Sequence, residues 1–254
     1  WVHALSPISS TFLTFSHQDV DFDSARADYD YYQLSATYGR RLRDIEWSLQ
    51  LGRNRIERDT GSEISGASYG LSLDWNKGYH SIQLGALADV TDSSLGNRNQ
   101  LLVGDVNLGN QLDFDSEFRE PDATDRTSLE LLWSTRKWVC DLCRTSVFFR
   151  NVDEDFLSSN AEREQTFARV AITLQPSTVR RYTLAYENSG FESTTDAQVV
   201  EQKEDRWQFS AFHKALKDLE VGFKLSWRDR DQARNNATDS QELRSSLSLE
   251  YILF

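Results

Sequence analysis

The sequence predicts an all-β protein whose 254 residues form one domain, a transmembrane antiparallel up-and-down β-barrel of about 12 strands. Three observations lead to this fold class. Apolar and polar side chains alternate along one segment after another. The connections between these segments alternate between short and long. Aromatic residues gather near both ends of the segments. Any domain that precedes Trp1 in a longer protein would be absent from this chain.

Alternation with a period of two residues is the signature of a strand that has one apolar face. In the segment from Leu219 to Trp227, for example, every second residue is apolar. Apolar residues at helical spacing do not persist anywhere. We also expect an opening strand near Phe12–Phe15 and another near Thr145–Phe149. The remaining alternating segments are 32–38, 45–51, 67–75, 82–86, 129–133, 168–174, 182–186, 207–211, 219–227 and 243–251.

Connection length is the second observation. The predicted short turns are 39–44, 76–78, 135–137, 176–180 and 214–218. The predicted long loops are 17–28, 53–64, 89–126, 150–164, 187–206 and 228–242. Transmembrane barrels have short turns on the periplasmic side and long loops outside, whereas a β-sandwich has no reason to sort its loops in this way. The short turns are basic and the long loops acidic, and an even strand count would place both chain ends on the short-turn side.

Aromatic side chains mark both ends of the alternating segments. Such residues form girdles at the two interfaces of a membrane. The alternative is a soluble barrel whose core holds scattered aromatics. The membrane-interface residues predicted at the short-turn ends are Tyr38, Trp47, Trp75, Trp133, Tyr182 and Tyr251, and those at the long-loop ends are Tyr32, Tyr69, Tyr186, Trp207 and Trp227.

Composition excludes several classes of protein. The 28 basic and 40 acidic residues give a net charge of −12, which argues against a nucleic-acid partner because phosphate binding needs clustered Lys and Arg. No apolar run reaches the roughly 18 residues of a transmembrane helix. The aromatic content of 12% argues against disorder. Because the chain has no methionine, Trp1 is not an initiator, and we expect a mature chain or a fragment.

The chain ends in an alternating segment, Leu247 to Phe254, with a C-terminal phenylalanine. This ending resembles the sorting signal of Gram-negative outer-membrane β-barrel proteins. The resemblance implies an integral outer-membrane location, insertion by the barrel-assembly machinery, and contact with outer-membrane lipids and lipopolysaccharide. Phe254 departs from the usual pattern, because it is out of phase with Tyr251 and Leu249. The resemblance identifies a superfamily and names no specific family or substrate.

The polar partners in each alternating segment would line the inside of such a barrel. Early segments contribute acidic residues and later ones mainly basic residues, so opposite sides of the lumen would carry opposite charge. Such a field orients polar solutes in a pore. The alternative is that these charges pair across the lumen and plug it. The predicted pore-lining residues are Glu46, Asp74, Glu130, Arg169, Arg181, Lys214, Lys224, Arg228 and Arg244.

The two cysteines, Cys140 and Cys143, form the only short motif. A lone CxxC offers too few ligands for a structural metal site, so no metal or other cofactor is expected. We interpret the pair as a small disulfide loop on the periplasmic rim, with two free thiols as the alternative. None of the four histidines has a serine two residues away on the same strand face, the arrangement that resembles outer-membrane phospholipases. We therefore expect no enzyme, and a lipid hydrolase is the least favoured function.

The loop 89–126 contains the apolar run Leu101-Leu102-Val103, which is unusual for an exposed segment. Loops of this length are usually functional or disordered. We expect it to plug the barrel, cover the pore mouth or contact a protein partner, and the alternative is a pair of strand extensions above the membrane. The sequence favours a narrow channel or export pore for polar or charged solutes. The alternative is a plugged structural barrel that serves as an anchor or scaffold in a larger outer-membrane assembly, such as one for polysaccharide or protein export.

Overall fold

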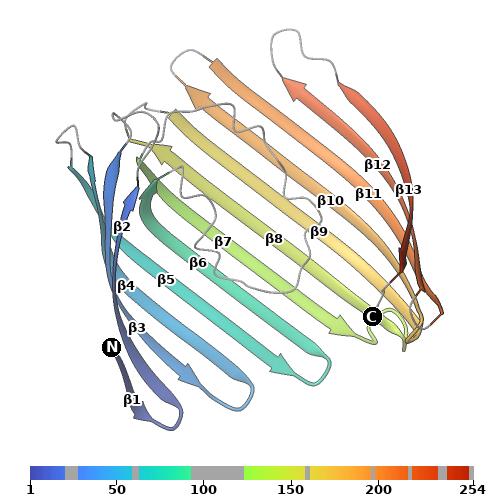
Figure 1. The fold of residues 1–254 in the computed structure, drawn as a ribbon, viewed down its shortest axis with the longest axis horizontal. Helices are drawn as coiled ribbons and strands as arrows, with labels where there is room; N and C mark the ends of the chain where they lie inside the picture. Colours follow the sequence, from blue (N-terminus) through green and yellow to red (C-terminus); the bar gives the residue numbers. More distant parts are fainter. Residues whose placement is uncertain are drawn as a thin grey trace. The chain divides into compact units, whose positions relative to one another are not determined.

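The computed structural model describes residues 1–20, 28–58, 63–92, 123–157, 161–195, 198–216, 219–233 and 239–251. These residues form 13 strands of one antiparallel up-and-down sheet, in which each strand pairs with its sequence neighbours (Figure 1). Within the described residues, no helix is long and apolar enough to cross a membrane. The strands are β1 (Val2–Ser6), β2 (Ser9–Val20), β3 (Tyr29–Arg41), β4 (Ile45–Arg58), β5 (Glu63–Lys77), β6 (His80–Asp92), β7 (Ala123–Arg136), β8 (Cys143–Phe156), β9 (Ala161–Ser177), β10 (Arg180–Thr195), β11 (Gln198–Leu216), β12 (Leu219–Ala233) and β13 (Ser240–Tyr251).

The chain divides into two compact units, which we describe separately. Unit 1 comprises residues 1–75, 83–130 and 152–163. Unit 2 comprises residues 76–82, 131–151 and 164–254. The division passes through β5, β6, β7, β8 and β9, so each unit contains parts of these five strands.

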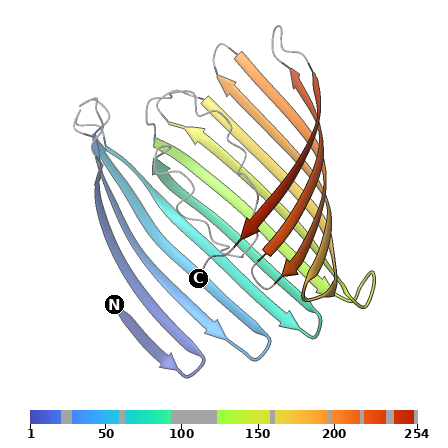
Figure 2. The same cartoon turned by 45° about the vertical axis from the view of Figure 1, so that its right-hand side comes forward.

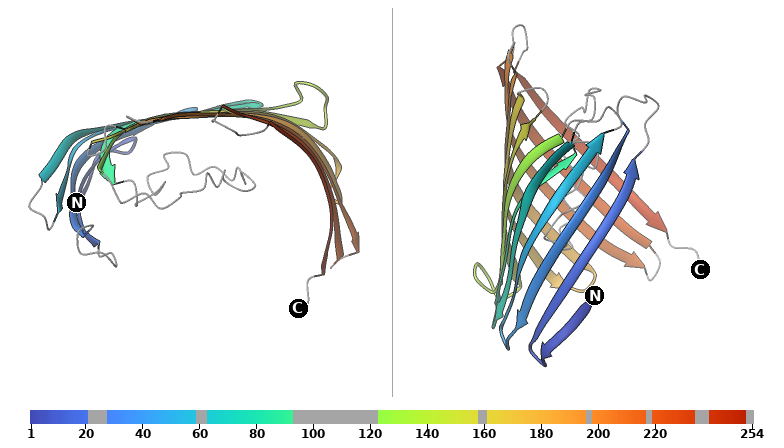
Figure 3. Two further views of the ribbon diagram at one scale, coloured as in Figure 1. Left: turned by 90° about the horizontal axis from the view of Figure 1, so that it is seen from above. Right: turned by 90° about the vertical axis from the view of Figure 1, so that its left-hand side faces the viewer.

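In unit 1, β1 to β5 lie side by side, and β2 to β5 pair in continuous register (Figure 3). An apolar cluster forms where β3, β4 and β6 approach the long-loop side. Tyr31 lies opposite Ile56, and both are buried together with Val90. Gly66 makes room for this cluster, because a Cβ atom there would lie 2.3 Å from a methyl carbon of Val90.

In unit 2, β10 to β13 are neighbours in sequence order (Figure 2). Their register places an aromatic row across three strands, because Trp207 on β11 lies opposite both Tyr186 on β10 and Trp227 on β12. The Tyr186 and Trp207 rings are 4.8 Å apart between centroids. This aromatic row therefore follows from register rather than from sequence proximity.

The strand count differs from the expected even number. The extra strand is β1, whose Val2 pairs with Phe12 of β2 across a turn that contains Pro7. β1 has only five residues, and Ala4 and Leu5 are both apolar, so no alternating pattern stands out in the sequence. With 13 strands, the first strand runs toward the short-turn side instead of starting there, so the expectation that both ends lie on that side was wrong.

Several predicted long loops are also largely strand. The segment 187–206 belongs to β10 and β11 apart from residues 196–197, which lie outside the described residues. Likewise β4 continues to Arg58, β8 to Phe156 and β12 to Ala233. These extensions are mainly polar and hold only isolated buried apolar residues such as Ile56 and Val152, so apolar alternation does not reveal them. Most of loop 89–126 and the C-terminal Phe254 lie outside the described residues.

Candidate functional site

The two faces of each unit differ in chemistry. In unit 1, Leu51 lies opposite Tyr69, and both side chains are more than half exposed although they are large and apolar. In unit 2, Phe209 lies opposite both Leu184 and Leu225, and all three are exposed. We call the face that carries these residues the apolar face of its unit. Side chains one position along the strand point to the other side, the polar face.

The polar face of unit 2 carries charged residues in register across four strands. Glu187 on β10 lies opposite Arg206 on β11, and Arg206 lies opposite Arg228 on β12. Arg228 in turn lies opposite Glu242 on β13. Two like charges directly opposite each other destabilise a sheet unless another group neutralises them.

Glu204 supplies that neutralising group. It lies two residues from Arg206 on the same face of β11, and only 3% of its side chain is exposed. One carboxylate oxygen accepts a hydrogen bond from Arg206 Nη2 at 2.8 Å and lies 2.9 Å from Arg228 Nε. The other carboxylate oxygen accepts hydrogen bonds from Arg230 at 3.2 and 3.3 Å. One buried carboxylate thus joins three guanidinium groups.

Further pairs extend this network to the neighbouring strands. Arg169 on β9 lies 3.3 Å from Glu187, and Arg244 donates to Glu242 at 2.5 Å. The network contains five arginines and three glutamates, which leaves an excess of two positive charges. We call it the charge ladder. Its members are Arg169, Glu187, Glu204, Arg206, Arg228, Arg230, Glu242 and Arg244.

The charge ladder lies at the level of the long-loop aromatic row. Glu187 directly follows Tyr186 in the sequence, and Arg228 directly follows Trp227. Since neighbouring residues of a strand share a height but point to opposite faces, the ladder lies behind this aromatic row. The ladder therefore lies near the middle of β10 and β11, at the level where the apolar alternation of these strands ends toward the long loops.

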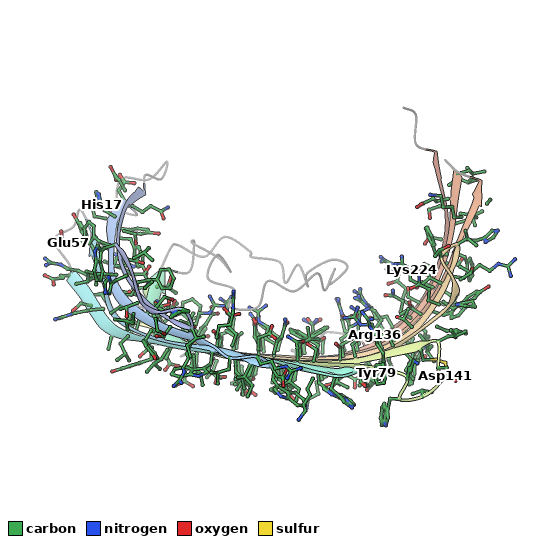
Figure 4. The ribbon with its side chains drawn as sticks, turned by 90° about the horizontal axis from the view of Figure 1, so that it is seen from below. His17, Glu57, Tyr79, Arg136, Asp141 and Lys224 are labelled. Carbon is green, nitrogen blue, oxygen red and sulfur yellow. A yellow bond between two sulfur atoms is a disulfide. The ribbon has the colours of Figure 1, made fainter. Side chains whose placement is uncertain are left out.

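Three predicted pore-lining residues of unit 2 lie outside the charge ladder. The Arg181 guanidinium stacks over the Phe212 ring at 5.2 Å from its centroid. Lys214 lies opposite Glu220 near the short turn between β11 and β12. Lys224 lies on β12, in register with serines on both neighbouring strands, and is exposed (Figure 4). The basic side chains predicted from the later segments thus share the polar face but form separate clusters.

The predicted acidic residues of unit 1 are differently placed. Glu46 forms a bidentate ion pair with Arg41 at 2.7 and 2.8 Å beside the turn that joins β3 and β4. The hydrogen bonds from Arg41 lower the pKa of the Glu46 carboxyl. Asp74 lies opposite Glu46 in the sheet and accepts a hydrogen bond from Gln83 at 3.0 Å. Glu130 is 7% exposed on the polar face.

The early strands are less uniformly acidic than the sequence predicted. In unit 1, Glu154 on β8 binds Arg163 on β9, with Arg163 Nε donating at 2.6 Å. Arg126 on β7 lies 3.8 Å from the same carboxylate, and its side chain is 5% exposed. Sequence reasoning missed this cluster because Glu154 and Arg163 fall in the predicted loop 150–164. The one available signal was the alternation of Arg126, Ser128 and Glu130 with the apolar residues of β7.

The predicted interface aromatics of the short-turn side lie near strand ends, whereas Tyr186, Trp207 and Trp227 lie near the middle of β10, β11 and β12, because these strands continue beyond the predicted long-loop ends. On the short-turn side of unit 1, the Tyr38 and Trp47 rings are 5.4 Å apart, and Trp75 lies opposite Ile45. On the same side of unit 2, Trp133 is 5.4 Å from Trp138. Tyr251 occupies the register position opposite Leu219.

The cysteines and histidines complete the predicted candidates. Cys140 and Cys143 are joined in a disulfide in the turn between β7 and β8. His17 contacts Asp30 at 2.7 Å and stacks on Tyr32, and neither contact includes a serine hydroxyl. Over the described ranges, no group of three or more His, Cys, Asp or Glu side chains could hold a metal ion.

No protein-family model matches this sequence, and the search of curated proteins also found no match. The geometry of the two faces is therefore the basis for a functional proposal.

Proposed function

We propose that this chain is an integral β-barrel of the Gram-negative outer membrane and acts as a narrow channel for polar or charged solutes. The apolar faces would contact lipid hydrocarbon, and the polar faces would line the lumen. Outer-membrane lipids and lipopolysaccharide would surround the protein, and the barrel-assembly machinery would insert it, as for other proteins with this type of C-terminal strand.

The observation that carries the proposal is the separation of exposed apolar rows from charged clusters on opposite sides of the same strands. An exposed row such as Leu184, Phe209 and Leu225 is unfavourable in water, because large apolar patches on soluble monomers are rare. From Leu219 to Trp227 the apolar positions of β12 span about nine residues, the length that a tilted transmembrane strand needs. A lipid environment accounts for both the exposure and the length.

The charge ladder supports a channel for anions in particular. Its two excess positive charges would lie at one mouth of the lumen, where low-dielectric walls strengthen the field on a passing ion. Each of its five guanidinium groups has a glutamate partner, so the site would be fixed in shape. Lys224, lower on the same face, would extend the positive surface into the lumen.

Single-channel recording in a planar bilayer tests this proposal. Under a salt gradient, the wild-type reversal potential should indicate a preference for anions. A Lys224→Glu/Arg244→Gln variant should shift that potential toward cations while conductance continues. Arg43→Gln is the matched control, because the Arg43 side chain is 96% exposed in a short turn and lies far from the ladder along the chain. This control should leave the reversal potential unchanged. Correctly folded protein that shows no conductance would contradict the proposed channel function.

A plugged structural barrel is the second candidate, and one observation favours it. On the polar face of unit 1, Asp89, Arg126 and Glu130 are at most 7% exposed. Burial of charged side chains on the prospective lumen side is what a filled lumen would produce. In that case the barrel would act as an anchor or scaffold of a larger export assembly, and any protein partner would be sought at loop 89–126.

A further inference from the structure

Backbone hydrogen bonds to neighbouring segments and a disulfide hold the turn between β7 and β8 in unit 2. We call residues 136–144 the disulfide hairpin. The Lys137 amide donates to Cys143 O at 2.9 Å, and the Arg136 amide donates to Tyr79 O of the neighbouring turn at 3.0 Å. The Gln175 amide of β9 donates to Leu142 O at 3.2 Å, and the disulfide closes the loop. The hairpin is thus held in one conformation.

The hairpin presents large apolar side chains to the exterior. Trp138 is 64% exposed, and Val139 and Leu142 are each more than half exposed. The hairpin bends to one side of its own strands (Figure 3). The direction is toward the apolar face, because Trp138 packs edge-on against Trp133, which follows Leu129 and Leu131 on that face. The exposed tip is therefore continuous with the apolar surface of β7.

The charges of the hairpin are opposite in sign to those of the chain as a whole. Arg136, Lys137 and Arg144 are exposed, and Asp141 is the one acidic residue between them, so the hairpin has a net charge of +2 in a chain of −12.

Lys137 has a φ of 64°, a backbone conformation that costs free energy for any residue with a Cβ atom. Its ammonium group lies 5.1 Å from the centre of the Tyr79 ring.

We propose that the disulfide hairpin is a binding site for anionic phospholipid headgroups. Trp138, Val139 and Leu142 enter the interfacial layer, and Lys137 beside them contacts a lipid phosphate. Tryptophan at the interface and basic residues beside an anionic surface are the two elements of such recognition. Continuity with the apolar face and the local reversal of charge select a lipid surface as the occupant rather than a protein. The inference rests on the proposed function, since it requires the apolar face to lie in a bilayer.

Fluorescence quenching by brominated lipids tests this site in the full-length chain. The protein is refolded into two sets of vesicles with the same proportions of phosphatidylglycerol and phosphatidylcholine. One set carries bromine on the phosphatidylglycerol and the other on the phosphatidylcholine. Subtracting the signal of a Trp138→Phe variant isolates the contribution of Trp138. We expect brominated phosphatidylglycerol to quench it about twofold or more above brominated phosphatidylcholine at equal mole fraction.

Charge-removing variants then separate the possible outcomes. Lys137→Gln should bring the two quenching efficiencies close to equal, whereas Lys77→Gln, the same change in a neighbouring short turn, should leave the preference intact. Equal quenching in the wild type would overturn the headgroup site. Absence of quenching at Trp138 would also overturn it, and would point to a protein-facing hairpin. If Trp227 were unquenched as well, by the same subtraction with Trp227→Phe, the proposed membrane location itself would fail.

Discussion

Arg206 and Arg228 lie directly opposite each other on β11 and β12, and both contact the same carboxylate oxygen of Glu204. Two guanidinium groups that lie directly opposite each other on neighbouring strands would repel without this shared anion. The arrangement makes Glu204 the residue on which the charge ladder depends. It also explains how five arginines can lie close together on the polar face of the five strands β9 to β13.

The first prediction concerns removal of that carboxylate. Glu204→Gln should destabilise the folded protein by about 3–5 kcal/mol, because three arginines would lose the charge that neutralises them. Urea titration of the protein refolded in lipid or detergent measures this loss. The control is Glu201→Gln on the same strand, whose ion pair with Lys203 is exposed. It should change stability by at most about 0.5 kcal/mol. Equal effects of the two substitutions would contradict the central role of Glu204.

The second prediction distinguishes the two faces of β11. Phe209→Arg places a charge on the apolar face and should cost about 2–4 kcal/mol if that face lies in the hydrocarbon layer. Gln208→Arg adds the same side chain one residue earlier, on the polar face, and should cost about 1 kcal/mol or less. The free energy of unfolding in phospholipid vesicles gives both values. A larger cost at Gln208 than at Phe209 would reverse the assignment of the faces.

Much of this two-faced arrangement could be predicted from the sequence, for a clear physical reason. Residues such as Leu225 and Trp227 alternate with polar neighbours because one face must be apolar, and this pattern is local. The position of Glu204 could not be predicted in the same way. It lies beyond the aromatic row, where both faces of the strand are polar and no apolar alternation indicates a strand. Its contact with Arg230 further depends on the register between β11 and β12, which is set by the hydrogen-bonded ladder and by the turn between the strands.

The amino-terminal strand shows the same limit at the other end of the chain. Val2, Ala4 and the apolar Leu5 give no regular alternation over the five residues of β1, so the sequence does not indicate a strand there. Pairing with β2 supplies the hydrogen bonds that hold this segment extended, including one from the Trp1 amino group to Leu13 O at 2.9 Å. Long-range pairing of this kind leaves no signature within five residues.

The third prediction concerns the close approach of Gly66 to Val90 in unit 1. Gly66→Ala would place its methyl group 2.3 Å from a Val90 methyl carbon, and should destabilise the protein by about 1–3 kcal/mol through overpacking. Val90→Ala removes the clashing methyl groups, so the double variant should recover part of that loss. A double-mutant cycle on unfolding free energies measures the coupling. Strictly additive effects would show that the two positions do not share this space.

The fourth prediction concerns pH and the Arg41–Glu46 pair beside the turn between β3 and β4. The hydrogen bonds from Arg41 lower the pKa of Glu46 below its unfolded value, so the pair stabilises the folded state when the carboxyl is ionised. This contribution is fully present above the unfolded pKa of glutamate and is lost as the pH falls through the lower folded value. The stability difference between wild type and Glu46→Gln should therefore be largest near neutral pH and shrink in acid. Because the pair is exposed, high salt should also reduce it, and urea midpoints measured across pH at two salt concentrations test both trends. A difference that grew in acid would contradict the pair's role, because it would require the protonated carboxyl to be the stabilising form.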